Sequence, residues 1–168
     1  MIIAIFGQSK VGKTSSAAAL SVASGFPIRS CGDELKRTLA KEGISGEVPE
    51  EIHKDIDQQT VHWATSSPEE VRLVEGRFLH YVLSDLTQPI YLVRLIASPE
   101  VRLTRLRDVN IGIDDLLALD QRDESFCNTI YGGRLPLAPA VTVDTSYLTV
   151  QSCVERLTNL IQEQLRPS

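Results

Sequence analysis

Residues 7–14 limit the possible folds of this chain more than any other segment, because they fit the spacing G-x-x-x-x-G-K-[ST] at every fixed position. In this pattern the glycines let the backbone curl, so that successive N–H groups point at phosphate oxygens. The apolar run 2–6 precedes the segment, and a helical pattern that begins at Ser15 follows it. Strand, glycine loop and helix in this order predict an α/β fold with a phosphate-binding loop at the end of a buried strand.

The residues of this loop predict a site for a nucleoside triphosphate and Mg²⁺. The pattern places the ammonium group of Lys13 on the β- and γ-phosphates and the hydroxyl group of Thr14 on the metal ion. The positive end of the helix dipole that follows adds to the attraction for anions. The predicted nucleotide-binding residues are Gly7, Gln8, Ser9, Lys10, Val11, Gly12, Lys13, Thr14 and Ser15.

Length, charge and cysteine content narrow the class of protein. A chain of 168 residues with 42% hydrophobic residues suits a single domain with a full core, and we expect a monomer. The net charge of −5 argues against nucleic acid or a membrane surface as the main partner, since both demand a basic face. We therefore expect a small-molecule partner, whose phosphate groups are met by local arginines.

The sequence also predicts a cytoplasmic protein. Its three cysteines form no C-x-x-C pair, which favours reduced thiols over a disulfide framework or a zinc site. The first apolar run leads directly into the phosphate loop, unlike a signal peptide, and no run approaches the roughly 20 residues of a membrane span.

Short apolar runs alternate with segments of helical periodicity, as in α/β proteins. Gly25 is predicted to end the first helix, and Ser98 and Thr149 to begin two later ones. Short crossovers of this kind predict three layers, a five-stranded parallel sheet with helices on both faces, and ligands at the carboxyl ends of the strands. The predicted strands are 2–6, 26–30, 71–75, 90–96 and 140–144.

Two segments of the single domain 1–168 exceed what a minimal fold of this class needs. Segment 33–67 is largely helical and polar, and segment 109–139 mixes acidic residues with glycine and proline. We expect the first to form a helical flap that selects the substrate and the second to form a lid, the two parts that a small-molecule kinase requires.

Two further motifs carry charge that suits phosphates. Glu75 ends a predicted strand, and Gly76 turns the chain so that it presents Arg77. The carboxylate can hold Mg²⁺ and the guanidinium group can clamp a substrate phosphate. The helix after residue 99 adds three arginines, Arg102, Arg105 and Arg107. Their positions alone do not show which of them contacts the nucleotide, and our candidate is Arg105.

Together these segments resemble the cytidylate kinases, most of all their short archaeal form, over almost the entire chain. The resemblance rests on the phosphate loop and on four further segments in matching order, 25–33, 74–77, 97–102 and 143–146. It implies the P-loop nucleoside monophosphate kinase fold. It also implies transfer of the γ-phosphoryl group of ATP, with Mg²⁺, to a pyrimidine nucleoside monophosphate, CMP or dCMP above all.

The resemblance assigns roles by position. The residues that match catalytic positions of the family are Lys13, Arg77 and Arg122. Those that match the metal site are Thr14 and Glu75. The acceptor site is implied at Asp33, Arg37, Glu75, Gly76 and Arg77. The alignment can slide by one residue in the flap, so Lys36 remains an alternative to Arg37 as the flap cation.

The chain departs from the family after Arg122. Between Asp123 and Gly132 it has no lysine or arginine, whereas the family has at least one further cation that closes over the phosphates. Because phosphoryl transfer depends on positive charge around the transferred group, loss of such an arginine can lower turnover by about 10³ or more. Arg134 is the nearest replacement.

Three functions other than a nucleoside monophosphate kinase have to be weighed against the motifs. A regulatory GTPase is disfavoured, because the chain lacks N-K-x-D and a suitably placed D-x-x-G. A P-loop nucleotide-binding or sensor protein with weakened transfer is favoured by the loss of cations in the lid. A kinase of another small metabolite is left open by the flap segment 33–67.

Overall fold

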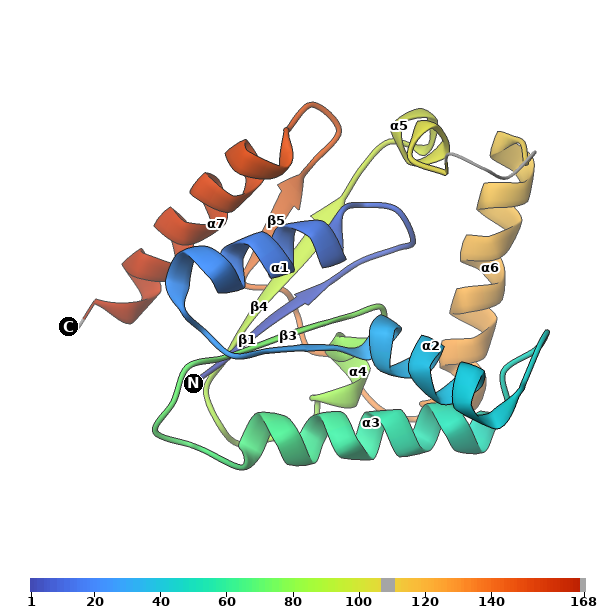
Figure 1. Ribbon diagram of the computed structural model, residues 1–168, viewed down its shortest axis with the longest axis horizontal. Coiled ribbons are helices and arrows are strands. Elements are labelled where there is room, and N and C mark those ends of the chain that lie inside the picture. Colours follow the sequence, from blue (N-terminus) through green and yellow to red (C-terminus); the bar gives the residue numbers. More distant parts are fainter. Residues whose placement is uncertain (107–110, 167–168) are drawn as a thin grey trace.

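A computed structural model of the chain describes residues 1–106 and 111–166 (Figure 1). The strands are β1 (Ile2–Phe6), β2 (Ile28–Ser30), β3 (Arg72–Gly76), β4 (Ile90–Ile96) and β5 (Val141–Asp144). They form one parallel sheet in the order β2-β3-β1-β4-β5. The helices of the described residues are α1 (Lys13–Ser24), α2 (Cys31–Glu42), α3 (Glu50–Thr65), α4 (Leu79–Val82), α5 (Pro99–Thr104), α6 (Ile113–Ile130) and α7 (Val150–Leu165).

The predicted five-stranded parallel sheet is confirmed, with small shifts at the strand ends. β1 and β4 have the predicted bounds. β2 begins at Ile28 and not at residue 26, because Pro27 has no N–H group for the ladder; its carbonyl group accepts a hydrogen bond from the Leu73 N–H (3.0 Å). β3 has the predicted length but is shifted by one residue, so that it begins at Arg72 and ends at Gly76, which pairs with Phe6 of β1.

The central strand β1 is buried on both faces, as is usual in a parallel sheet. Ile3 and Ile5 belong to one core cluster, in which α1 and α7 take part through residues such as Leu157. The alternate residues Ile2 and Ala4 belong to a second cluster with α3, α4 and the end of α6. Helices on both faces of the sheet thus form the predicted three layers (Figure 1).

The predicted helix ends are also confirmed. Gly25 ends α1 in the left-handed region, with a φ of 74°, and its N–H donates to the Ser21 carbonyl group (2.8 Å). Ser98 and Thr149 precede α5 and α7, and each hydroxyl group accepts a hydrogen bond from an N–H in the first turn. Local signals therefore determine where these helices begin and end.

The two additional segments lie beside the carboxyl end of β3. Segment 33–67 contains α3 and most of α2, which pack on each other, and α6 makes up most of segment 109–139 (Figure 1). Residues 109 and 110 of that segment lie outside the described residues. Side chains from α2, α3 and α6 line one cleft together with Arg77, so both segments contribute to the same site.

We expect His80 to make the protein less stable in acid. The His80 ring in α4 stacks on Phe6 (4.5 Å between ring centroids), and burial, followed by the charge of Arg94, lowers its pKa to about 4. Between pH 6.5 and pH 4 the unfolded chain therefore binds the proton more readily than the folded chain. The stabilising effect of neutral His80 is complete above pH 6.5 and is lost as the pH falls toward 4.

The check is thermal unfolding from pH 7.5 to pH 4 of the natural chain and of His80→Phe, which keeps a stacking ring but cannot titrate. Asp57, whose pKa is raised to about 6 by burial, acts in the opposite direction but is present in both proteins. As the pH falls over this range, the unfolding temperature of the natural chain should decrease more than that of the variant. Parallel curves would contradict the role of His80.

Candidate functional site

The phosphate loop joins β1 to α1 in a conformation that depends on glycine. Gly7 has a φ of 149°, and a Cβ atom at this position would lie 2.2 Å from the Leu95 carbonyl oxygen. Gly12 has a φ of 95°. Lys10 is the one non-glycine residue with a positive φ (64°) in the described part of the chain. The backbone thus has the sharp curl that a phosphate cradle requires.

The side chain of Lys13 lies over this loop. Its ammonium group donates to the Gln8 carbonyl group (2.8 Å). Burial lowers the pKa of Lys13 to about 8; Glu75 opposes this shift and Arg77 adds to it. Lys13 is therefore still mainly a cation at neutral pH, and it lies within electrostatic range of both Glu75 and Arg77.

Three oxygen-bearing side chains meet at the start of α1 and the carboxyl ends of β2 and β3. The Thr14 hydroxyl group donates to Glu75 Oε1 (3.2 Å), and the Ser30 hydroxyl group donates to the same oxygen. Glu75 is 2% exposed. Hydroxyl and carboxylate oxygens are the hard donors that Mg²⁺ prefers, so the residues present fit the metal site that the sequence predicts.

Arg102 connects the loop to α6. Its guanidinium group, 2% exposed, makes two hydrogen bonds of 2.7 Å to the Asp120 carboxylate. It also donates to the Ser9 carbonyl group (2.8 Å) and to the Gln8 side chain (3.0 Å). These bonds tie the phosphate loop to α6.

The other two arginines of this group have different positions. Arg105 donates to the Lys10 carbonyl group (3.2 Å) and to both oxygens of Thr145 (3.1 and 2.7 Å), which places it against the phosphate loop. Arg107 lies outside the described residues.

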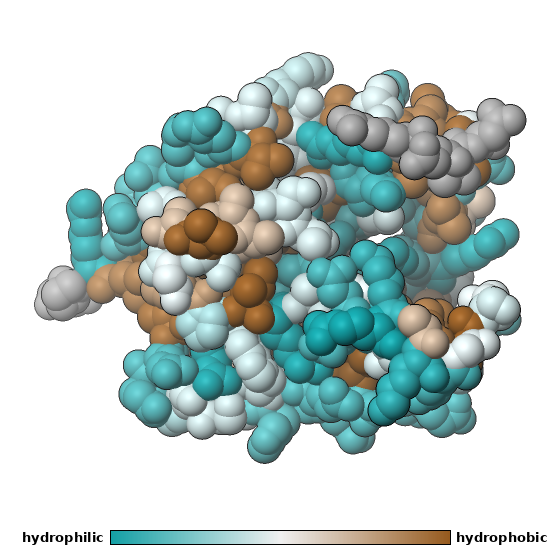
Figure 2. Space-filling view, in the orientation of Figure 1, coloured by the Kyte–Doolittle hydropathy of each residue, from teal (hydrophilic) through white to brown (hydrophobic). Residues whose placement is uncertain are grey.

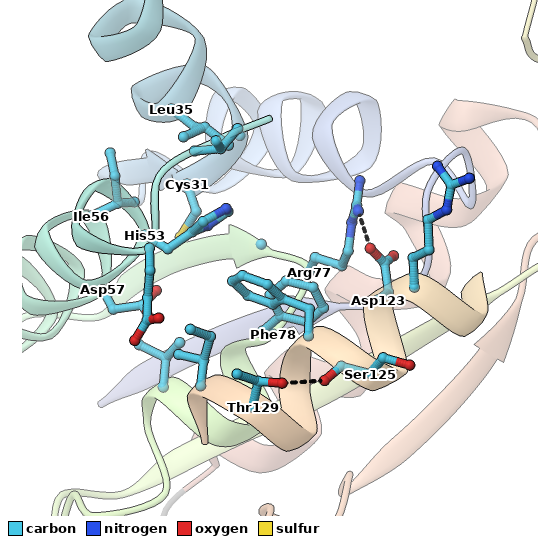
Figure 3. Close-up of a pocket in the computed structure, with 18 of the residues that line it drawn as sticks. Cys31, Leu35, His53, Ile56, Asp57, Arg77, Phe78, Asp123, Ser125 and Thr129 are labelled. Atoms are coloured by element: carbon cyan, nitrogen blue, oxygen red, sulfur yellow. Dashed lines mark hydrogen bonds and ion pairs between the residues drawn. The ribbon is translucent and has the colours of Figure 1, made fainter. Parts of the chain in front are cut away.

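A cleft of about 1270 Å³ opens between α2 and α3 on one side and α6 on the other (Figure 3). Arg77 and Arg122 both line it. Arg77 forms an ion pair with Asp123 of α6 (2.6 Å). In the space-filling view the molecule is hollowed in this region, and hydrophilic side chains border the hollow (Figure 2). The cleft is therefore open to solvent, and α2 and α3 form one of its walls and α6 another.

Aromatic rings form part of the cleft wall. Phe78 and Phe126 stack with 5.5 Å between ring centroids, and His53 lies 4.5 Å from Phe126 (Figure 3). Asp57 lines the cleft as well. Neither His53 nor Asp57 belongs to a recognisable motif, although the two are four residues apart, which places them on one face of α3.

The predicted flap residues point elsewhere. The carboxylate of Asp33 accepts a hydrogen bond from Lys36 (3.0 Å), and Arg37, 69% exposed, pairs with Glu34 (2.8 Å). Neither Asp33 nor Arg37 is among the residues that line the cleft. The structure thus brings Lys13, Arg77 and Glu75 together but does not bring Arg37 to them, and its predicted role stays a prediction.

Known proteins resemble this chain in part of its sequence and in its fold, although no protein-family model matches it. A cytidylate kinase of Fervidobacterium nodosum is 29% identical over 102 residues, which is 56% of this chain and 45% of that protein. The match thus spans less than half the length of the curated relative.

Solved structures match nearly the whole chain. A putative kinase from Chloroflexus aurantiacus has a TM-score of 0.65 at 18% identity and covers 96% of both chains. Shikimate kinase from Aquifex aeolicus has a TM-score of 0.61 at 18% identity and covers 98% of both chains. A gluconokinase from Sinorhizobium meliloti has a TM-score of 0.60 at 18% identity, covering 98% of this chain and 97% of that chain.

The five-stranded parallel sheet with its phosphate loop is therefore the α/β fold of the P-loop kinases. In sequence the chain is similar to the Fervidobacterium cytidylate kinase over the matched part. Among the helices of residues 1–106 and 111–166, none is long and apolar enough to cross a membrane.

We expect Asp120→Ala to destabilise the protein strongly, because it leaves the buried Arg102 without its counter-charge. Loss of one partner of a buried ion pair costs about 3–5 kcal/mol. The matched control is Asp85→Ala, whose partner Arg134 lies 3.4 Å away with both side chains largely exposed. An exposed pair contributes about 0–1 kcal/mol.

The measurement is the free energy of unfolding in denaturant for both variants. Equal, small losses would show that the Arg102–Asp120 pair does not stabilise the loop.

Proposed function

We propose that this protein is a Mg-ATP-dependent kinase of a small acceptor, and that the acceptor is a nucleoside monophosphate, CMP or dCMP above all. The observation that carries the proposal is the position of Arg77, which lines an open cleft while lying within electrostatic range of Lys13 in the phosphate loop. Nucleotide phosphates and an acceptor phosphate can therefore meet. We propose further that the protein acts as a cytoplasmic monomer and binds neither nucleic acid nor membranes.

The donor side uses the phosphate loop. Its backbone N–H groups and Lys13 bind the ATP phosphates, and Arg105 lies beside them against the loop. Thr14 and Glu75 would hold Mg²⁺, which when bound neutralises charge on the β- and γ-phosphates. We expect ATP bound in this way to direct its γ-phosphoryl group toward Arg77.

On the acceptor side Arg77 exchanges partners. Its ion pair with Asp123 gives way to a two-pronged contact with the acceptor phosphate, for which a guanidinium group is well shaped. An oxygen of that phosphate then bonds to the γ-phosphorus of ATP as the bond to the β–γ bridging oxygen breaks, and ADP leaves. Arg122, which also lines the cleft, approaches the transferred group when α6 closes and excludes water.

The charge of the cleft favours a second candidate, a kinase of another small metabolite. Among the described residues that line the cleft, two are cations, Arg77 and Arg122. Four are acids: Glu47, Glu50, Asp57 and Asp123. An excess of acids lowers affinity for a dianionic phosphate and favours an acceptor rich in hydrogen-bond donors. The same scarcity of cations supports slow transfer, as in a nucleotide sensor.

The deciding experiment measures ADP formation from Mg-ATP with CMP, dCMP, UMP, AMP and GMP, beside shikimate, gluconate and a control without acceptor. We expect turnover that depends on CMP or dCMP. Turnover with a non-nucleotide alone would support the second candidate. Tight ATP binding without turnover on any acceptor would support the sensor.

Arg77→Ala tests the acceptor site. We expect kcat/KM for the acceptor to fall about 10- to 100-fold, the value of a hydrogen-bonded charge contact, while ATP affinity is unchanged. Lys13→Ala should instead weaken ATP binding, and Arg156→Ala, at an exposed position on α7, should change neither. An unchanged acceptor KM and kcat in Arg77→Ala would show that Arg77 does not bind the acceptor.

A further inference from the structure

The cleft has two chemically different ends. Arg77 and Asp123 lie at the end near the phosphate loop, and Asp57 of α3 lies at the other, with Phe78 between them (Figure 3). A ligand whose phosphate group contacts Arg77 therefore extends along the aromatic wall toward Asp57.

The carboxylate of Asp57 has a fixed position. Its Oδ2 accepts a hydrogen bond from the Tyr131 hydroxyl group (2.6 Å). Tyr131 is itself buried, 5% exposed, and its ring stacks on Tyr81 with 5.2 Å between centroids and 5° between planes. This packing leaves little freedom to the hydroxyl group, so the carboxylate it contacts is held in one orientation.

Within the described part of the chain, Asp57 has no neutralising partner close by. No lysine, arginine or histidine nitrogen of residues 1–106 and 111–166 lies within 4.0 Å of its carboxylate, and Arg134 acts on it only from a greater distance. Burial raises its pKa to about 6, and it is mainly ionised at neutral pH. A half-buried carboxylate of this kind is stabilised by any hydrogen-bond donor that a ligand brings.

The aromatic wall selects the shape of that ligand. Phe78 and Phe126, which stack on each other, both line the cleft and give it an apolar aromatic wall against which a planar heterocycle can pack. An exocyclic amino group at the edge of such a ring donates to a carboxylate. An oxo group at the same place would present one acceptor to another and leave both unsatisfied.

We propose that Asp57 determines base specificity, accepting a hydrogen bond from the exocyclic amino group of an acceptor base that packs against the wall formed by Phe78 and Phe126. This inference rests on the proposed function, because it requires a nucleoside monophosphate in the cleft. Tyr131 is the positioning residue that orients the carboxylate. The chemistry selects aminopyrimidines, such as cytosine, over oxopyrimidines, such as uracil.

The test compares CMP with UMP for the natural chain, Asp57→Asn and Tyr131→Phe. Each protein is measured by kcat/KM and by calorimetric binding of the two monophosphates. Asp57→Asn should lower the CMP-to-UMP ratio at least about tenfold, because a carboxamide can donate to the oxo group and removes the charge. Tyr131→Phe should lower the ratio less, through weaker CMP binding. Both variants should retain ATP binding, which reports that they fold.

The matched control is Asp55→Asn, two residues away on the exposed side of α3, which should leave the ratio unchanged. If the natural chain prefers CMP and Asp57→Asn keeps that preference, Asp57 does not read the base, although the proposed function stands. The same conclusion follows if the natural chain uses CMP and UMP equally. If the natural chain neither binds nor phosphorylates any nucleoside monophosphate, the proposed function itself fails and this inference fails with it.

Discussion

The buried guanidinium group of Arg102 holds together the parts of the molecule on which the site depends. It bonds to the Ser9 backbone and the Gln8 side chain in the phosphate loop and to Asp120 in α6. A buried cation is tolerated only while its partners remain in place. The loop, the corner after β4 and the α6 helix therefore form one electrostatic unit, and any movement of α6 over the cleft must keep or exchange these bonds.

The sheet supplies a rigid base for this unit. β1 is buried on both faces between two core clusters, and the phosphate loop leaves it directly. β3 lies beside β1, so Glu75 and Arg77 emerge next to the loop although they are more than 60 residues away in the chain. Parallel pairing thus brings donor and acceptor chemistry to one edge, the usual ligand site of such sheets.

Electrostatics distinguish this cleft from a strongly basic phosphate trap. Arg77 is already paired with Asp123, and Asp57 adds an acidic group at the opposite end. The acceptor phosphate that we propose would have to displace the Asp123 carboxylate from Arg77, and this exchange would lower the affinity for the acceptor. The cleft therefore attracts anions only modestly, and Asp57 accepts hydrogen bonds at its far end. For such a cleft we expect discrimination between ligands to depend more on shape and hydrogen bonding than on net charge.

Much of the fold was predictable because its signals are local. The spacing around Gly7, Gly12 and Lys13 predicts the loop, apolar runs predict the five strands to within two residues, and Ser98 is a sequence-level helix cap. The roles of Arg102 and Asp57 could not be predicted from the sequence, because their hydrogen-bond partners lie 18 to 94 residues away in the chain. The amino-acid pattern alone is sufficient to predict the individual strands and the phosphate loop, because the signals for each lie within a few consecutive residues. Which charges pair follows only from the folded structure, because burial and the distance between remote segments govern those interactions.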